Sequence, residues 1–308
     1  MIEKNHILCN LCGSDDPAPL FEAKDRLHGS EEPFTYVRCK RCGLVYMNPQ
    51  IARDEIAAFY PATYNPFQSQ PKRQLSDEHK LRRAARRRPF GTFICKKLNR
   101  HSRLLDVGCG SGGFLHEMRI LTGCRTFGLD ISQLAAKAAI ENYGLDIHVG
   151  TILAAPFPER YFDVITAWEY LEHVDDPSGV LSKMSSLLKN DGSCVISTPN
   201  FDSFNRRLFK DRWYALDCPR HLYLYSPTTI GGLLRKNGLS VQKIKYDKSS
   251  KGILGSLQYY FYGDNYNPAH ANRIRRSSFL RKIASPIARI SALLRQSDTM
   301  AIHAKKTI

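Results

Sequence analysis

Four of the nine cysteines form two closely spaced pairs near the N-terminus. Cys9 and Cys12 lie in CNLCG, and Cys39 and Cys42 lie in CKRCG. A C-x-x-C spacing lets two thiolates of one tight turn bind the same ion, and the following glycine lets the chain turn behind them. Two such turns supply the four sulfur ligands of a closed structural zinc site. The pattern therefore predicts a zinc module over residues 1–50, with a redox-active pair as the alternative.

A second group of candidate residues lies where an apolar stretch, RLLDV, runs into a glycine-rich loop, GCGSGG. Glycines at a strand-to-helix turn let a ligand approach the backbone, and they expose amide groups at the helix N-terminus. Gly108, Gly110 and Gly113 also fit the dinucleotide pattern G-x-G-x-x-G. Asp106, however, suits a cationic amino group better than a pyrophosphate, and Asp130 can accept both hydroxyls of a ribose. The pattern favours a cofactor with an amino acid at one end and a ribose at the other.

A third group consists of carboxylates and histidines further along the chain, in WEYLEHV and in PRHLY. If the first segment is helical, Glu169, Glu172 and His173 are spaced i, i+3 and i+4 and share one side. They can then bind a divalent cation, or His173 can act as a base that Glu172 orients. For Glu169, capping and support of the core is an alternative role. His221 is a candidate for the acceptor site or for a structural hydrogen bond.

The elements that position these residues alternate between strands and helices from residue 103 onward. Strands are expected at 103–109, 125–131, 146–150, 162–167 and 192–198, with helices over 112–121, 132–142 and 177–188. This alternation predicts an α/β fold with a parallel sheet covered by helices on both faces. In such sheets ligands bind beyond the carboxyl ends of the strands, and the candidate residues above fall at those ends.

Taken together, these motifs resemble a known family. LLDVGCGSGGFL followed by FGLDIS is similar to the first two motifs of class I S-adenosylmethionine-dependent methyltransferases, and FDVITAWEYLEHVDDP and GSCVISTPN resemble their fourth and fifth strand motifs. The resemblance covers residues 103 to about 250. It implies a Rossmann-like seven-stranded sheet whose last strand is antiparallel, and residues 298–306 are the candidate for that strand.

The same resemblance implies site residues. Asp106 and the loop 108–112 would hold the methionine part of S-adenosylmethionine, and Asp130 would hold the ribose. The expected cofactor-binding residues are Asp106, Gly108, Cys109, Gly110, Gly112, Asp130, Ile131, Thr151 and Trp168. EYLEHV resembles a segment of ubiquinone-biosynthesis O-methyltransferases in which the matching carboxylates and histidine bind magnesium. The E-H pair also resembles that of sugar C-methyltransferases, which carry a similar zinc module and use this histidine as a base.

Charge is concentrated in two stretches. The chain has 45 Lys and Arg against 29 Asp and Glu, a net charge of +16. Residues 72–103 carry +10 and residues 270–308 carry +8, so the remainder is close to neutral. Such surfaces suit anionic partners, although a solvated face is the alternative. We expect residues 51–100 to form a basic helical connector and residues 101–308 the methyltransferase domain, with insertions at about 200–225 and 249–297.

The second insertion contains an apolar repeat with interleaved basic residues. Phe279, Ile283, Ile287 and Ile290 recur at helical spacing, and Pro286 interrupts the pattern. A basic amphipathic helix can lie on an anionic membrane surface, or it can pack on its own domain or on a second subunit. This segment can therefore contact a membrane peripherally or contribute to a homodimer, and the sequence leaves both alternatives open.

Weighing these features predicts a methyltransferase for a small anionic acceptor. The expectation is O-methylation of a sugar on a nucleotide-linked or lipid-linked glycan, in surface polysaccharide or secondary metabolism. The alternatives are a membrane-associated quinone or phenol O-methyltransferase and an RNA methyltransferase, which the missing amine-methylating motif disfavours. The N-terminus lacks a secretion pattern, and no apolar run is long enough for a membrane span, so a cytoplasmic location is expected.

Overall fold

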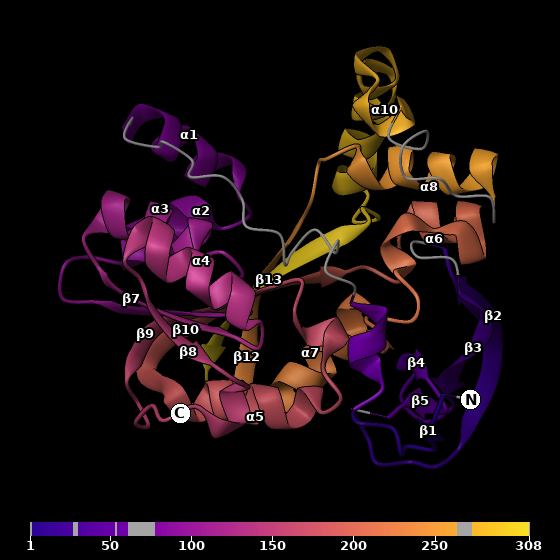
Figure 1. Cartoon of the computed structure of the whole chain (residues 1–308), viewed down its shortest axis with the longest axis horizontal. Helices are drawn as coiled ribbons and strands as arrows, with labels where there is room; N and C mark the ends of the chain where they lie inside the picture. Colours follow the sequence, from indigo (N-terminus) through magenta and orange to yellow (C-terminus); the bar gives the residue numbers. More distant parts are fainter. Residues whose placement is uncertain (1, 27–29, 53, 61–77, 264–272, 308) are drawn as a thin grey trace.

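The computed structural model describes residues 2–26, 30–52, 54–60, 78–263 and 273–307. A central seven-stranded sheet, a four-stranded antiparallel sheet and a two-stranded sheet make up its strands (Figure 1). Residues 61–77 of the expected connector lie outside the described residues. In the part of the chain that the structure describes, no helix combines the length and apolarity needed to cross a bilayer.

The central sheet has the strand order β12-β13-β10-β9-β6-β7-β8. Its strands are β6 Arg103–Val107, β7 Arg125–Asp130, β8 Asp146–Val149, β9 Phe162–Trp168, β10 Leu188–Pro199, β12 Leu239–Tyr246 and β13 Thr299–Lys306. β13 pairs antiparallel with both β10 and β12, whereas the pairs from β10 to β8 are parallel. The expected sheet and its antiparallel last strand are thus confirmed.

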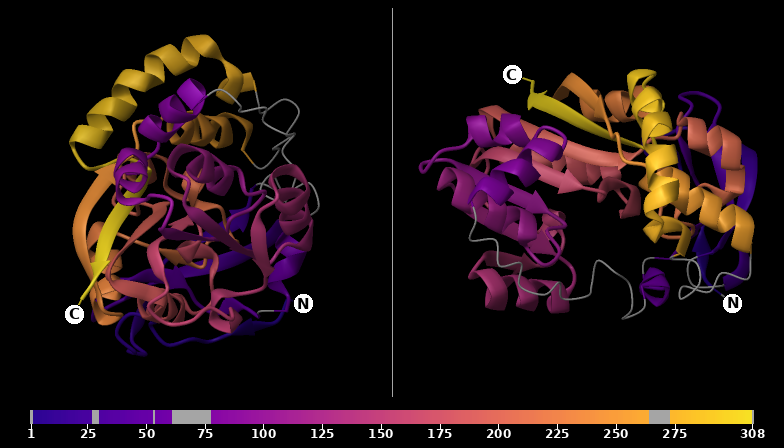
Figure 2. Two further views of the ribbon diagram at one scale, coloured as in Figure 1. Left: turned by 90° about the vertical axis from the view of Figure 1, so that its left-hand side faces the viewer. Right: turned by 90° about the horizontal axis from the view of Figure 1, so that it is seen from above.

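Helices cover both faces of this sheet. α2, α3 and α4 lie on one side, and α5 and α7 lie on the other (Figures 1 and 2). Their bounds are α2 Gly91–Lys97, α3 Gly113–Thr122, α4 Gln133–Tyr143, α5 Pro177–Leu187 and α7 Pro227–Lys236. The strands between them are largely buried, which is why RLLDV and FDVITA read as nearly continuous apolar runs.

The N-terminal module is built around an antiparallel sheet of order β11-β4-β3-β2. Its strands are β2 Pro17–Asp25, β3 Ser30–Cys39, β4 Val45–Met47 and β11 Tyr223–Leu224, and β1 Lys4–Asn5 pairs separately with β5 Gln50–Ile51. β11 belongs to the insertion after β10, yet it pairs with β4 through Tyr223 and Tyr46. The module and the insertion therefore share one sheet.

The remaining helices lie in the connector and the two insertions. They are η1 Ile56–Phe59, α1 Glu78–Arg87, α6 Phe204–Phe209, η6 Tyr214–Leu216, α8 Lys251–Tyr262 and α10 Ser278–Leu293. Trp213 is only 1% exposed, and its Nε1 donates to Asp298 Oδ1 at 2.7 Å. Tyr223 is equally buried. Both rings are part of the core.

A buried ion pair connects β2 to the insertion. Arg220 Nη1 and Nη2 donate to the two carboxylate oxygens of Asp25 at 2.8 and 2.9 Å, and neither side chain exceeds 1% exposure. Arg220 also donates to Asp217 Oδ1 at 2.8 Å. Burial alone would lower the pKa of Arg220, but the negative charges of Asp217 and Asp25 raise it above its usual value. The guanidinium ion is therefore held charged inside the protein.

We predict that Asp25→Ala destabilises the protein by about 3–5 kcal/mol, because it leaves a buried charge with half of its counter-charge. Urea unfolding followed by circular dichroism measures this free energy. Asp211→Ala is the matched control: its carboxylate pairs with Arg26 of the module at 2.6 Å but is 42% exposed. That variant should lose less than about 1 kcal/mol. Equal losses in the two variants would contradict the role given to the buried pair.

Candidate active site

The glycine-rich loop between β6 and α3 has the backbone that its composition predicts. Gly108, Gly110 and Gly112 have φ angles of +73°, +52° and +77°, values that residues with a side chain rarely adopt. A Cβ atom at Gly108 would lie 2.6 Å from Cδ2 of Tyr170. The loop therefore runs against the segment that follows β9, and Tyr170, which the sequence analysis did not single out, joins the two.

Asp130 ends β7 beside this loop. Its Oδ2 accepts a hydrogen bond from Gly110 N at 2.8 Å, and its Oδ1 accepts one from Ser132 N at 2.9 Å. Burial raises the pKa of this carboxyl. Ile131 is 64% exposed, and Thr151 follows the next strand, β8. Asp130, Ile131 and Thr151 thus lie at the carboxyl edge of the sheet, where the cofactor is expected.

Asp106 lies deeper, at 2% exposure. Its Oδ1 accepts a hydrogen bond from Thr166 Oγ1 at 2.6 Å. Burial raises the pKa of Asp106 to about 7, while the Thr166 hydrogen bond and the positive charge of Arg88 act in the opposite direction. Cys109 is half-buried, and its thiol contacts Gly110 O at 3.7 Å. The carboxyl of Asp106 is therefore close to half-ionised at neutral pH until a cation reaches it.

Arg88 is a second residue that the sequence analysis did not single out, because nothing distinguished it from its neighbours in the arginine run. Its guanidinium lies 4.7 Å from the ring centroid of Phe114 and 5.4 Å from that of Trp168. Its Nη2 is 3.3 Å from Glu117 Oε2. Trp168 Nε1 is buried without a hydrogen-bond partner among the described residues. Arg88 and Trp168 thus bring a cation and an aromatic ring to the site around Asp106.

Glu172, His173 and His221 meet in one cluster. One ligand atom from each lies within 4.8 Å of the others, and the two imidazole rings are in edge contact, with centroids 4.5 Å apart. Glu172 is fully buried, and neither of its oxygens has a hydrogen-bond partner in the described part of the chain. Burial, and then the charge of Glu169, raises its pKa well above the usual value. The structure therefore unites two segments that are almost 50 residues apart.

Hydrogen bonds to backbone carbonyls orient both rings. His173 Nδ1 lies 3.1 Å from Arg220 O, and His221 Nδ1 lies 3.0 Å from Ala215 O. Since a carbonyl only accepts, each Nδ1 carries the proton and each Nε2 keeps its lone pair. Burial lowers the pKa of His173 to about 3 and also lowers that of His221. Both rings are thus neutral at physiological pH, with Nε2 able to take up a proton or a metal ion.

Glu169 stands apart from the expected helix. The chain takes a left-handed turn at Glu169, with φ of +47°, and only Leu171–His173 form a short 3-10 helix, η4. The expected i, i+3, i+4 arrangement on one helix is therefore wrong, because the helix does not begin until after this turn. Glu169 Oε1 accepts from Ser197 Oγ at 2.6 Å. Its side chain is exposed, and desolvation by the protein atoms around the carboxyl raises its pKa.

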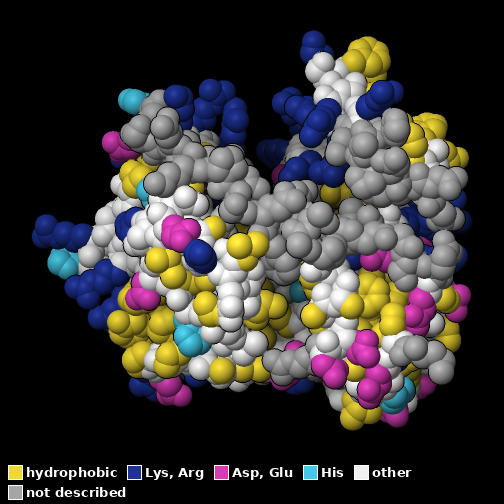
Figure 3. Space-filling view, in the orientation of Figure 1, with side chains coloured by type: hydrophobic (Ala, Val, Ile, Leu, Met, Phe, Trp, Pro, Cys, Tyr) yellow, Lys and Arg dark blue, Asp and Glu magenta, His cyan; other side chains and the backbone are white. Residues whose placement is uncertain are grey.

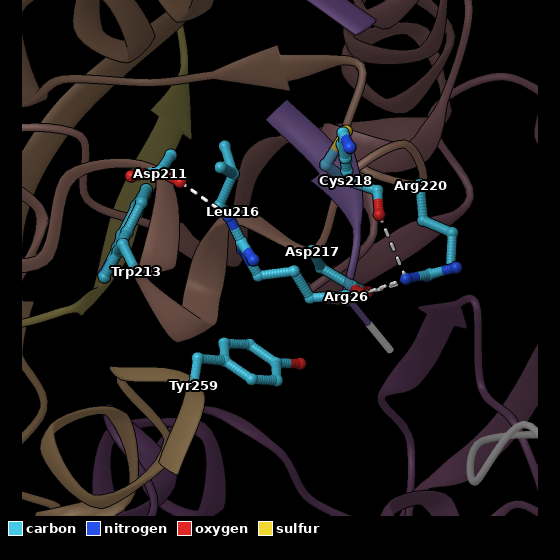
Figure 4. Close-up of a pocket in the computed structure, with 9 residues that line it drawn as sticks. Arg26, Asp211, Trp213, Leu216, Asp217, Cys218, Arg220 and Tyr259 are labelled. Atoms are coloured by element: carbon cyan, nitrogen blue, oxygen red, sulfur yellow. Dashed lines mark hydrogen bonds and ion pairs between the residues drawn. The ribbon is translucent and has the colours of Figure 1, made fainter. Parts of the chain in front are cut away.

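The N-terminal module contacts this cluster directly. The hydroxyl of Tyr36, on β3, donates to His221 O at 2.8 Å, and the hydroxyl of Tyr60 lies 3.0 Å from His173 Nδ1. Figure 4 shows Asp217 facing Arg220 in a small pocket between the module and the insertion. Because the carbonyl of Arg220 accepts from His173, the side chain that joins the two parts also fixes the position of a candidate catalytic residue.

The four N-terminal cysteines converge as expected. Their sulfur atoms all lie within 4.8 Å of one another, and the closest pairs, Cys9–Cys42 and Cys12–Cys39, are each 3.5 Å apart. Sulfurs on a zinc ion at about 2.3 Å stand about 3.8 Å apart in a tetrahedron, so the cluster fits that ion. Glycines at 13 and 43 take positive φ directly after each pair, as a tight turn requires.

Comparison with known proteins agrees with this geometry. A methyltransferase-domain family model matches residues 77–244, more than half of the chain. The ubiquinone biosynthesis O-methyltransferase of Burkholderia vietnamiensis is 31% identical over 156 residues, which cover 46% of this chain and 66% of that protein. The enzyme of the same name from Pasteurella multocida is 41% identical over 114 residues, covering 32% and 46%. The matches thus span about half to two thirds of these relatives.

A solved structure shows the same fold. The geranyl diphosphate C-methyltransferase of Streptomyces coelicolor superposes with a TM-score of 0.52 at 15% sequence identity, covering 80% of this chain and 86% of that protein. Sheet order, glycine loop, family match and this superposition agree. The chain belongs to the class I S-adenosylmethionine-dependent methyltransferases.

Proposed function

We propose that this protein transfers the methyl group of S-adenosylmethionine to a hydroxyl of a small anionic acceptor, with His173 as the general base. The observation that carries the proposal is the set of contacts that His173 makes. Its Nδ1 lies 3.1 Å from Arg220 O and 3.0 Å from the hydroxyl of Tyr60, whereas its Nε2 has no hydrogen-bond partner among the described residues. A neutral imidazole with a free Nε2, on the segment that contacts the glycine loop through Tyr170, can take up the hydroxyl proton in an O-methylation.

The cofactor would lie along the carboxyl edge of β6, β7 and β8. Asp106 would face the ammonium group, with Arg88 near the carboxylate, because these are the two opposite charges beside the loop. Asp130 would accept the ribose hydroxyls, while Ile131 and Thr151 would border the adenine. Such an arrangement aligns the sulfonium methyl with the acceptor, and alignment supplies much of the rate in a methyl transfer.

In the chemical step the acceptor oxygen forms a bond to the methyl carbon while the carbon–sulfur bond breaks. The bonding pair stays on sulfur, which becomes the neutral thioether of S-adenosylhomocysteine. The hydroxyl proton moves to Nε2 of His173, whose ring belongs to the same cluster as Glu172 and His221. Proton removal by a positioned base typically contributes about 10²–10⁴-fold.

The same three side chains also fit a divalent cation. Glu172 offers a buried carboxyl without a hydrogen-bond partner among the described residues. His173 and His221 offer two neutral imidazoles whose Nδ1 atoms lie against backbone carbonyls. This donor set suits zinc, manganese or iron better than magnesium, which prefers oxygen ligands. When bound, such an ion would lower the pKa of an acceptor hydroxyl. The magnesium ion that the sequence suggests stays a prediction.

For the acceptor we propose a sugar of a nucleotide-linked or lipid-linked glycan. Polar groups border the cluster: Glu169 is hydrogen-bonded to Ser197, and its pKa responds to charges at Asp247 and Lys251. A surface of this kind suits an acceptor with several hydroxyls better than a quinone ring. The second candidate is a phenol or quinone, which the similarity to ubiquinone biosynthesis O-methyltransferases favours.

A labelling experiment tests this function: pure protein and labelled S-adenosylmethionine are added to the aqueous, lipid and RNA fractions of source cells. We expect label in the aqueous or lipid fraction, and His173→Ala should reduce it about 10²–10⁴-fold without changing the affinity for S-adenosylhomocysteine. His148→Ala, on β8 outside the cluster, is the matched control. If brief chelation abolishes activity and manganese restores it, His173 acts as a metal ligand and not as the general base. Label in RNA alone, or an active His173→Ala, would overturn the proposal.

Cofactor binding should depend on pH through Asp106. Burial raises its pKa to about 7, so below that pH binding a cationic ammonium must first remove a proton. Affinity should therefore rise up to about tenfold per unit as pH increases toward 7, and level off above it. Isothermal titration with S-adenosylmethionine at pH 6, 7 and 8 measures this slope. Asp106→Asn should bind weakly and without the slope; a variant that keeps the slope would exclude this residue as its source.

We also propose that Cys9, Cys12, Cys39 and Cys42 hold a structural zinc ion. Cys39→Ser should lose about one zinc per chain by elemental analysis, and the N-terminal module should become sensitive to protease. Cys95→Ser, whose half-buried thiol lies outside the cluster, should keep its zinc. A Cys39→Ser protein with full zinc content would remove the basis for the assignment.

A further inference from the structure

The exposed side of α10 is unusually apolar for a surface helix. Large side chains along one row are between 43% and 68% exposed: Phe279, Ile283, Ile287, Ile290 and Leu294. The opposite side, Ala284 and Ala288, is at most 4% exposed and packs on Ile253 and Leu254 of α8. In most surface helices the large apolar residues face the core. Here the small residues hold the helix in place, and the large ones remain available to a partner.

Basic residues flank this apolar row. Arg281, Lys282, Arg289 and Arg295 are all exposed, and the sequence contains no Asp or Glu from residue 273 to residue 297. A helix with a large apolar row, flanking cations and no acidic residue has the composition of helices that lie in a membrane interface. Its partner must therefore offer both an apolar layer and negative charge.

A second basic helix lies on the same side of the molecule. On α1, Leu81 and Ala85 are buried, whereas Arg82, Arg83, Arg86 and Arg87 are exposed. Figure 3 shows Lys and Arg side chains gathered at the top of the view, over α1 on one side of a notch and over α10 on the other. The two basic stretches, almost 200 residues apart in sequence, thus face the same direction. One extended anionic surface can contact both at once.

A second copy of the chain fits this surface less well. In a two-fold dimer each patch meets its own counterpart, so Arg281, Lys282 and Arg289 would approach the same cations of the other copy. No carboxylate of the 273–297 segment is present to compensate. An anionic bilayer supplies the missing charge and also an apolar layer for the Phe279 row.

We propose that α10 and α1 form a binding surface for an anionic membrane, with the apolar row of α10 inserted at the boundary between headgroups and acyl chains. The arginines of α1 would contact lipid phosphates beside it. This partner goes beyond the proposed methyl transfer and does not depend on which hydroxyl is methylated. It adds that the enzyme works at a membrane surface, where a lipid-linked acceptor is concentrated.

Sedimentation with vesicles tests the proposal on the full chain. The vesicles are phosphatidylcholine, either pure or with about one third phosphatidylglycerol. The protein should bind the anionic vesicles at least about tenfold more tightly than the neutral ones, and raising salt from about 0.05 to 0.5 M should release it. Failure to bind anionic vesicles, or equal binding to both kinds, would overturn the proposal.

Two variants identify the surface. Phe279→Ser/Ile283→Ser/Ile290→Ser and Arg83→Ser/Arg86→Ser/Arg87→Ser should each weaken binding about tenfold or more. Leu134→Ser/Ile140→Ser on α4, which replaces residues 54% and 48% exposed, is the matched control and should bind like the parent. All three alter exposed side chains, and thermal unfolding verifies that they fold.

A different partner would give a different result. If the chain forms a dimer in light scattering that the α10 variant abolishes, and vesicles do not compete with it, then a second copy covers the helix and the membrane proposal is wrong. Methyl transfer to a water-soluble acceptor should be unchanged in both variants. Loss of vesicle binding with intact transfer therefore separates this inference from the proposed function.

Discussion

The guanidinium of Arg220 is completely removed from water, and carboxylates must therefore surround it at fixed positions. Asp25 comes from the N-terminal module and Asp217 from the insertion after β10, so the charge can be buried only when the two parts are assembled. A buried ion pair of this kind adds little net stability, but it strongly disfavours any assembly in which one partner is missing. We regard it as the constraint that fixes the module against the methyltransferase sheet.

This constraint reaches the chemistry through the backbone. The carbonyl of Arg220 lies 3.1 Å from Nδ1 of His173, and the hydroxyl of Tyr36 in the module donates to the carbonyl of His221. β11, the short strand that follows these residues, pairs with β4 of the module rather than with the central sheet. The N-terminal module thus contacts the insertion that carries His221, and a closed four-cysteine cluster, with no open ligand position, would act on the proposed acceptor site only through this packing.

The sequence predicted what depends on local pattern. Alternating apolar runs defined the central sheet, and the glycines at 108, 110 and 112 identified the cofactor loop because only a positive φ fits there. It could not predict that His221 meets Glu172 and His173, since their contact depends on a long insertion that folds onto another sheet. It also missed Arg88, since four other arginines share its run. The helical arrangement considered for Glu169 does not form, because the chain takes a left-handed turn there.

α8 packs on both α10 and the insertion after β10. α10 packs on α8, and the first turn of α8 is seated against Asp298, where a Cβ at Gly252 would lie 1.6 Å from the carboxylate. Asp298 in turn accepts from Trp213 of the insertion, and Lys251 in that first turn acts on Glu169 electrostatically. α10 is thus connected to Asp298 and Trp213 through close-packed contacts rather than through a flexible linker. Since α8 also packs on the insertion after β10, it contacts both the proposed membrane-binding helix and the segment that brings His221 to the Glu172–His173–His221 cluster.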